Sequence, residues 1–377
     1  MSKFQDATTL PIALAMRSMI QRIATGPELS KDLNEAEAEL GMRLILKGTA
    51  TPVEAAIFLI ALRMKRETSQ ENRGVLSAVR SATHRGVADV DDLIDIADPY
   101  DGFNRTLPSS PFLPAVLAAC GLSAVSHGVD AMGPKYGVTH ARVLKTAGVD
   151  VDASVDGAVA NIESHGWSYI DQSQFCPSLY GLKDLRTEMV KRPVITTVEV
   201  LAGPIVGRRA THLMTGYVHK PYPPIYSMLA RHAGFASCVL VRGVEGGVIP
   251  SLRQPGRMVH YFGDGEDEAM ALDPAELQIN SEQRAPQLPD GLRAVEPADG
   301  IGMTVDASQV AEAAVEQGLA ALSGKAGDVR ESLTYAGAIA LFHTRKCDDL
   351  SSAVTAVRAA LDSGSALERF NAARGAP

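Results

Sequence analysis

The stretch Leu93–Arg105, LIDIADPYDGFNR, decides the fold of this 377-residue chain. Leu93–Ala97 is a mainly apolar run of the length of a buried strand, and the turn residues Asp98 and Pro99 end it. The polar segment Asp98–Arg105 then lies where ligands bind in α/β sheets, outside the carboxyl end of a strand. We therefore expect an α/β fold with a ligand site at this edge of the sheet.

Similar short apolar runs recur after this stretch and alternate with helical segments and Gly or Pro breaks. The expected strands are Leu93–Ala97, Ser123–Ser126, His212–Val218, Cys238–Arg242 and Arg257–Phe262. This alternation is typical of a mainly parallel sheet with crossover helices. The acid-, Pro- and Gly-rich stretch Asp264–Asp299 is expected to be a surface excursion, and Ser332–Ala373 a closing helix-loop-helix.

The first ninety residues read as helices. Apolar residues recur at helical spacing from Leu14 to Ile23, and a second helix is expected over Asn34–Leu46. Thr51 and Glu54 around Pro52 predict a capped helix start, and the cations at the end of that helix are interpreted as solvated. These cations are Arg63, Lys65 and Arg66. We expect a helical lobe over residues 1–90, completed by residues 170–200, and an α/β lobe over residues 91–377.

The composition is that of an ordinary globular protein, with 46% hydrophobic and 21% charged residues. No run approaches the roughly 18 apolar residues of a membrane helix. The N-terminal residues Met1–Asp6 lack the basic start and apolar core of a secretory signal. The formal net charge of -8 disfavours broad binding to nucleic acid or anionic lipid. We therefore expect a cytoplasmic protein without a membrane segment.

Three segments with Gly or Pro breaks follow expected strands, and the first is Asp98–Arg105. It leads into Ser109 and Ser110, which stand at a helix start. Free backbone N–H groups there, together with Arg105, suit an anion. The alternative interpretation is a plain surface turn in which Ser109 or Ser110 caps the helix.

The second segment joins Ser126-His127-Gly128 to Met132–His140. Lys135, which lies between two glycines, suits a phosphate contact, and Thr139 is expected to cap the next helix. His127 is alternatively a hydrogen-bonded structural histidine. The third segment is the glycine-rich turn Arg242–Gly247. Its Glu245 suits a cation or a ribose hydroxyl, or has no chemical role.

The order and spacing of these segments resemble anthranilate phosphoribosyltransferase and its relatives in glycosyltransferase family 3, which share a nucleoside-phosphorylase-like fold. The resemblance spans almost the whole chain. It also rests on Gly48–Pro52, Ala61–Lys65, Ala118–Gly121, Ala338–Phe342 and Ala359–Gly364. It implies a small helical lobe, a larger α/β lobe with a central mainly parallel sheet, and a homodimer formed through the N-terminal helices.

Several active-site motifs of that family are altered here. The Gly-Thr-Gly-Gly-Asp-Gly loop for pyrophosphate is replaced by Asp98–Gly102, and the lysine of Lys-His-Gly is Ser126. The Asp-Glu pair for magnesium falls near Val248 and Ile249, which leaves Glu245 close by. A magnesium pyrophosphate needs oxygen ligands. The chain therefore resembles a divergent sister group, and true anthranilate activity is not expected.

The resemblance implies binding of a phosphorylated ribose, or a similar anionic sugar, in the cleft between the lobes, with pentosyl transfer to a small acceptor. Glu245 is the expected ligand of Mg²⁺, and no catalytic residue is assigned. The expected substrate-binding residues are Tyr100, Asp101, Gly102, Arg105, Ser109, Ser110, His127, Gly128, Lys135, Thr139 and Arg186.

Arg186 matches an arginine that holds the acceptor's carboxylate in the synthase. Its alternative is a helix-surface arginine paired with Asp184 or Glu188. One branch of the sister group binds nucleic acid through a basic helix, so a non-catalytic nucleic-acid-binding protein of the same fold is the alternative function. The cations that resemble that helix are Lys183, Arg186, Lys191 and Arg192.

Overall fold

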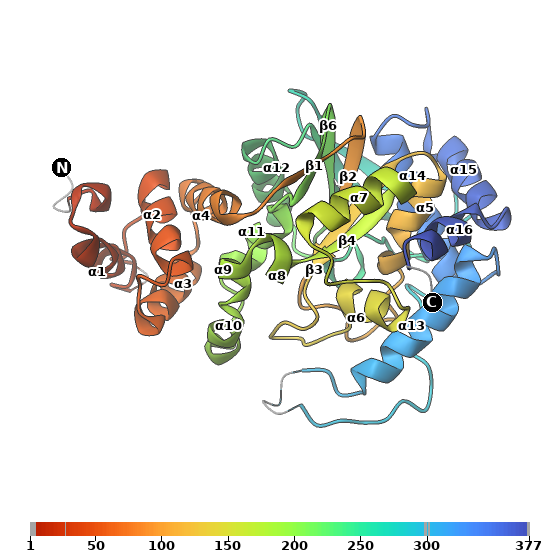
Figure 1. Ribbon diagram of the computed structural model, residues 1–377. Helices are drawn as coiled ribbons and strands as arrows, with labels where there is room; N and C mark the ends of the chain where they lie inside the picture. The colour runs from red at the N-terminus through yellow and green to blue at the C-terminus, as the bar shows by residue number, and fades with distance from the viewer. Residues whose placement is uncertain (1–4, 27, 298–299, 301, 375–377) are drawn as a thin grey trace.

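The computed structural model describes residues 5–26, 28–297, 300 and 302–374 (Figure 1). Residues 1–4, part of the segment that was interpreted as lacking a secretory signal, lie outside the described residues. Among the helices that are described, none is both long and apolar enough to cross a membrane.

Four helices form a lobe at one end of the molecule (Figure 1). They are α1 (Ile12–Ile23), α2 (Glu35–Leu46), α3 (Pro52–Lys65) and α4 (Ser69–Ala82). The predicted capping box of Thr51 and Glu54 at the start of α3 is confirmed. The solvated helix end predicted for Lys65 is wrong, because its Nζ pairs with Glu71 at 2.7 Å and with Asp32 at 2.6 Å.

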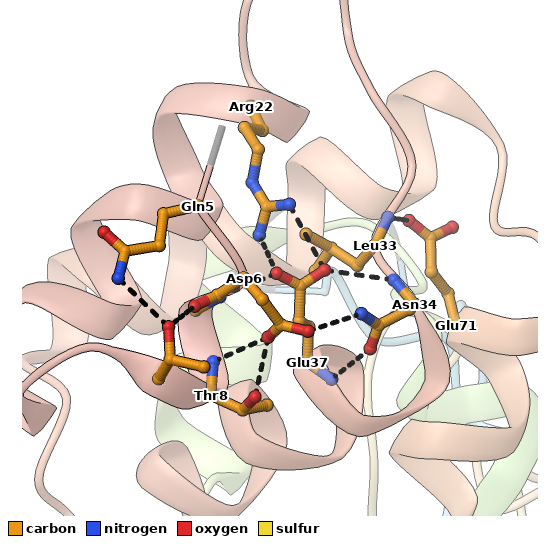
Figure 2. A network of polar contacts seen from close by, with 10 residues as sticks. Gln5, Asp6, Thr8, Arg22, Leu33, Asn34, Glu37 and Glu71 are labelled. Atoms are coloured by element: carbon orange, nitrogen blue, oxygen red, sulfur yellow. Dashed lines mark hydrogen bonds and ion pairs between the residues drawn. The ribbon is translucent and has the colours of Figure 1, made fainter. Parts of the chain in front are cut away.

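A buried polar network ties α1 to α2 (Figure 2). The Arg22 guanidinium donates to both carboxylate oxygens of Glu37, and these side chains are 7% and 2% exposed. Glu37 also accepts the backbone N–H groups of Ala7 at 2.8 Å and Asn34 at 3.1 Å. Because each buried charge has its partner and hydrogen bonds, the ion pair is tolerated away from water and holds the two helices in one arrangement.

A seven-stranded sheet forms the centre of the larger lobe, in the order β4-β3-β2-β6-β7-β8-β9. The pairs from β4 to β7 are parallel, whereas β8 and β9 are antiparallel. The expected mainly parallel sheet is confirmed, whereas β4 and β9 were not predicted. The strands are β2 (Asp92–Ala97), β3 (Ser123–Gly128), β4 (Trp167–Asp171), β6 (Ala210–Gly216), β7 (Ser237–Val241), β8 (Gly256–Phe262) and β9 (Glu268–Leu272).

Two hydrophobic cores lie on the two faces of this sheet. Leu93 and Ala97 pack in the core that includes the helical lobe, and Ile94 and Ile96 pack in the core of the C-terminal helices. A strand that is buried on both faces is apolar at successive positions, which is why Leu93–Ala97 was recognisable in the sequence.

The remaining helices cover these faces, and a small parallel sheet of β1 (Gly86–Ala88) and β5 (Ile205–Gly207) lies beside them. The closing helix-loop-helix predicted for Ser332–Ala373 is wrong, since three helices, α14 to α16, occupy that region. The helices are α5 (Leu113–Ala119), α6 (His140–Thr146), α7 (Val155–His165), α8 (Gln172–Phe175), α9 (Pro177–Tyr180), α10 (Lys183–Met189), α11 (Ile195–Val198), α12 (Tyr222–His232), α13 (Ala307–Leu322), α14 (Asp328–His343), α15 (Leu350–Asp362) and α16 (Ser365–Ala372).

Candidate functional site

A cleft opens at the carboxyl ends of β2, β6 and β7. Its inner compartment, of about 200 Å³, is lined by the turns after these strands, by Arg63 of α3 and by Thr196 of α11. Its outer compartment, of about 940 Å³, is lined by residues from the segments 104–106, 242–245, 251–256 and 284–287. Lys135 and Arg192 line both compartments. The cleft therefore lies between the sheet edge and the helical lobe, where the sequence predicted a ligand site.

Backbone pairing brings the loop after β2 against the loop that carries Lys135. Phe103 and Val138 exchange N–H···O bonds of 3.0 and 2.7 Å. Gly102 has a φ of 71°, and a Cβ there would lie 2.7 Å from the carbonyl carbon of Gly137. Only glycine allows this approach. As a result the Lys135 Nζ lies 3.4 Å from Asp101 Oδ1 in the cleft.

Two carboxylates at the cleft are already engaged by groups of the chain. The buried Asp101 pairs with Arg192 as well as with Lys135. Glu245 accepts the backbone N–H groups of Asn104 at 3.2 Å and Arg105 at 3.0 Å, and the hydroxyl of Thr106 at 2.9 Å. Its Oε2 also lies 3.9 Å from Lys135 Nζ.

This donor set does not fit the predicted Mg²⁺ site at Glu245. Mg²⁺ takes oxygen ligands in a near-octahedral arrangement. The oxygens of Glu245 instead accept three donors, and Lys135 places a positive charge where a metal would have to lie. Within the described ranges no group of three or more His, Cys, Asp or Glu side chains is suited to a metal ion.

Positive charge dominates the outer compartment. Among its described lining residues Glu245 is the single acid, opposite five cations. Three of these arginines are exposed and form no ion pair with the part of the chain that the structure describes. Such a compartment attracts anions. The five cations are Arg105, Lys135, Arg192, Arg242 and Arg284.

Tyr100 and His127 lie behind the cleft wall. Both are buried, the Tyr100 hydroxyl contacts His127 Nδ1, and His127 Nε2 lies 3.0 Å from Asp95 Oδ1. Burial, with the neighbouring Glu199 carboxylate, raises the pKa of Tyr100 well above its ordinary value, so its hydroxyl stays protonated beside the imidazole. The ligand contact predicted for these two residues is therefore corrected: His127 is the structural histidine that the sequence left open.

The serine pair after the first turn is also buried. Ser110 Oγ contacts Asp98, and His140 Nε2 lies 3.0 Å from the same Oγ. Asp98 in turn accepts the Val248 N–H at 2.8 Å. Ser109 and Ser110 do not line the cleft, so the anion contact predicted for their amides is not seen. Ser110 instead contacts Asp98, which joins the loops after β2 and β7.

Two other predicted positions serve the local structure. Thr139 caps α6, as the sequence indicated, and accepts the Arg142 N–H at 3.3 Å. Gly128 is the buried last residue of β3. Neither lines the cleft, so the substrate contact predicted for them is not seen.

Arg186 does not reach the cleft either. Its guanidinium forms two hydrogen bonds of 2.6 and 2.8 Å with the Glu199 carboxylate, and both residues are buried. The acceptor contact and the alternative pairing with Asp184 or Glu188 are therefore both wrong. Arg186 pairs instead with the buried Glu199, thirteen residues further along the chain.

The sequence analysis missed two cleft arginines. Arg63 was interpreted as part of a solvated helix end, yet it lines the inner compartment. Arg284 was placed in a surface excursion, yet that segment returns to the cleft, where Gln287 pairs with Thr106. No local pattern marks Arg284, whereas the position of Arg63 in a family-like segment was a usable signal.

The helical lobe, the mixed sheet and the cleft between them define the architecture of the glycosyl transferase family, and the chain belongs to this family. Residues 17–83 match the model described as "Glycosyl transferase family, helical bundle domain", and residues 101–367 match "Glycosyl transferase family, a/b domain". Within the family the chain is anthranilate phosphoribosyltransferase-like.

Individual relatives agree with this assignment. The chain is 28% identical over 354 residues to anthranilate phosphoribosyltransferase of Anaeromyxobacter dehalogenans, with 93% of this chain and 97% of the relative covered. It is 31% identical over 228 residues to an uncharacterized protein of Aquifex aeolicus, with 60% and 67% covered.

Solved structures show the same fold. Anthranilate phosphoribosyltransferase of Thermus thermophilus superposes with a TM-score of 0.73 at 22% identity, covering 98% of both chains. The Saccharomyces cerevisiae enzyme in complex with PRPP and Mg gives 0.72 at 16% identity, covering 94% of this chain and 96% of that chain.

Proposed function

We propose that this protein binds a phosphorylated ribose in the cleft and transfers the pentosyl group to a small acceptor. The observation that carries the proposal is the position of Lys135, which lines both compartments and lies in a cleft with three arginines that have no carboxylate partner among the described residues. The relatives named anthranilate phosphoribosyltransferase, one of them in complex with PRPP and Mg, support a phosphoribosyl ligand.

In such a transfer, the bond from the anomeric carbon to pyrophosphate breaks and a bond to the acceptor forms. The chain contributes position and charge, because Lys135 and the outer arginines stabilise the negative charge that develops on the leaving pyrophosphate. The inner compartment suits the acceptor, since Tyr217, Tyr222 and Tyr226 line it together with Arg63. The resemblance predicted magnesium at Glu245, but the donors around Glu245 do not fit that ion, and no step here is assigned to it.

Lys135→Ala is expected to weaken phosphoribosyl pyrophosphate binding about tenfold to a hundredfold, because a charge-assisted phosphate contact contributes about 1.5–3 kcal/mol. Isothermal titration calorimetry measures the dissociation constant, and a thermal-melting shift provides a second reading. The matched control is Lys145→Ala, since Lys145 is an exposed lysine of α6 outside the cleft.

Unchanged affinity in Lys135→Ala would remove Lys135 from the site. Absence of any binding by the unaltered protein, with and without Mg²⁺, would reject the proposed ligand.

The nucleic-acid alternative is not supported by its predicted basic helix. Arg186 is buried against Glu199, and Arg192 pairs with Asp101, which leaves Lys183 and Lys191. A single-stranded oligonucleotide is nevertheless the appropriate second titrant. Steeply salt-dependent binding of it, without binding of the sugar phosphate, would favour the alternative.

We further propose that the protein forms a homodimer through α1 and α3. Both helices carry exposed apolar side chains, among them Leu14 at 52% and Val53 at 67% exposure. Exposed apolar surface of this kind is typical of an interface. The double variant Leu14→Glu, Val53→Glu is expected to sediment as a monomer, whereas Leu29→Glu, at an exposed leucine outside these helices, leaves the dimer intact.

Analytical ultracentrifugation over a concentration series measures the oligomeric state of the unaltered protein and of both variants. A monomeric unaltered protein at every concentration, or a dimer that survives both substitutions, would reject the interface. The cytoplasmic location remains a prediction.

A further inference from the structure

We infer that the outer compartment binds the ligand's phosphate or diphosphate group directly on Arg105, Arg242 and Arg284, without a divalent cation. The inference rests on the proposed function, since it assigns the anionic end of the same sugar-phosphate ligand. It adds the site of that group and the chemistry that neutralises it.

The three arginines come from three separate parts of the chain. Arg105 follows β2, and Arg242 directly follows β7. Arg284 lies in the long connection between β9 and α13, where its carbonyl accepts the Leu252 N–H at 3.0 Å. The neighbouring Pro286 carbonyl accepts the Leu107 N–H at 2.9 Å. Backbone hydrogen bonds therefore anchor the segment that carries Arg284 on the cleft wall.

The charges of the compartment leave these arginines available. Lys135 and Arg192 both pair with Asp101, and Lys135 also lies within 3.9 Å of Glu245. Two cations thus offset two carboxylates, whereas Arg105, Arg242 and Arg284 remain without a carboxylate partner among the described residues. A guanidinium group binds phosphate oxygens through two parallel N–H···O bonds, so this set suits a phosphate or diphosphate.

The same charges explain why a metal ion is not required. A Mg²⁺ ion in a phosphate site usually bridges the phosphate to one or two carboxylates. Here Glu245 is occupied by two backbone amides and a hydroxyl, and the surrounding side chains are positive. A further cation would be repelled, whereas the arginines themselves supply the neutralising charge.

The size of the compartment fits a small ligand. Its volume of about 940 Å³ lies near the upper end of the roughly 300–1,000 Å³ of small-molecule sites. A sugar bearing a diphosphate can be accommodated there with its anomeric carbon toward the inner compartment at Lys135.

The test is calorimetric titration of the full-length protein with inorganic pyrophosphate and with phosphoribosyl pyrophosphate, once in EDTA and once in MgCl₂. We expect both ligands to bind in EDTA. The double variant Arg242→Gln, Arg284→Gln is expected to bind pyrophosphate about a hundredfold more weakly, about tenfold for each arginine. The matched control Arg257→Gln, at an exposed arginine of β8 outside the cleft, keeps the original affinity.

The outcomes separate the inference from the proposed function. Binding only in MgCl₂ would overturn the metal-independent site but leave the phosphoribosyl ligand in place. Binding in EDTA that survives the double variant would overturn the assignment of the phosphate to Arg242 and Arg284, whatever the effect of Lys135→Ala, because Lys135 lines both compartments. Binding of neither ligand under either condition would remove the proposed function itself. An unchanged melting temperature of the double variant shows that folding is not the cause.

Discussion

Glu199→Leu is expected to lower the free energy of unfolding by about 3–5 kcal/mol, because it leaves the Arg186 guanidinium buried without its carboxylate. Arg186 and Glu199 are 5% and 1% exposed and share two hydrogen bonds. The backbone carbonyl of Glu199 also lies 3.5 Å from the Tyr100 hydroxyl. The pair thus connects α10 to the turn after β2. Urea-induced unfolding measures the change in the free energy of unfolding.

The double variant Arg186→Met, Glu199→Leu is the control. It removes both charges and keeps apolar volume, so it is expected to recover most of the lost stability. The single variant Arg186→Lys, in which Glu199 is unchanged, should retain little of the stability that the pair provides. An ammonium group cannot form the two parallel contacts of the guanidinium. If Arg186→Met left the unfolding midpoint unchanged but abolished binding of an acceptor, Arg186 would be a ligand-contacting residue and the structural role would be wrong.

Elements with strong local signals were predictable from the sequence. Leu93–Ala97 is buried on both faces and apolar at four of its five positions, and Thr51 and Glu54 form a capping box within the first turn of α3. Strand β4, Trp167–Asp171, was missed because only three of its five residues are apolar or aromatic and they form no continuous run. Helix α4 was not named separately, although it lies in the first ninety residues, which were predicted to be helical, and its buried apolar residues Val75, Leu76 and Val79 are at helical spacing.

The candidate site was less predictable, because long-range contacts create it. The sequence singled out Lys135 and Arg105 correctly as cleft residues, since both lie in turns after strands. It could not show that Glu199 pairs with Arg186, because the two are not at helical spacing. It also could not place Arg284, whose segment is held at the cleft by long-range backbone contacts with Thr106, Leu107 and Leu252.

The turn Arg242–Gly247 was recognisable from its local sequence, but long-range contacts hold its conformation. It brings Arg242 and Glu245 to the cleft, and the backbone of Glu245 has a φ of 52°, which is uncommon for a residue other than glycine. Such a conformation persists where the surrounding structure holds it. Here the backbone of the turn packs closely against two glycines. A Cβ on Gly216 would lie 2.1 Å from the Gly247 carbonyl oxygen, and a Cβ on Gly243 would lie 1.6 Å from it.

Gly243→Ala is therefore expected to destabilise the protein by about 3 kcal/mol and to weaken pyrophosphate binding at least about tenfold. The added methyl group meets a backbone carbonyl, which cannot turn away as a flexible side chain can. Movement of the turn would displace Arg242 and release Glu245 from the amides of Asn104 and Arg105. Urea unfolding and calorimetric titration measure the two effects.

Gly256→Ala is the matched control for this substitution. Gly256 also lines the outer compartment, but a Cβ there meets nothing within 4 Å and its φ is not in the left-handed region. Its replacement by alanine is expected to be neutral or slightly stabilising, because alanine has fewer conformations in the unfolded chain. If both glycine variants bound pyrophosphate like the unaltered protein, the turn would not position the anion-binding arginine, and Arg105 and Arg284 would have to hold the phosphate without it.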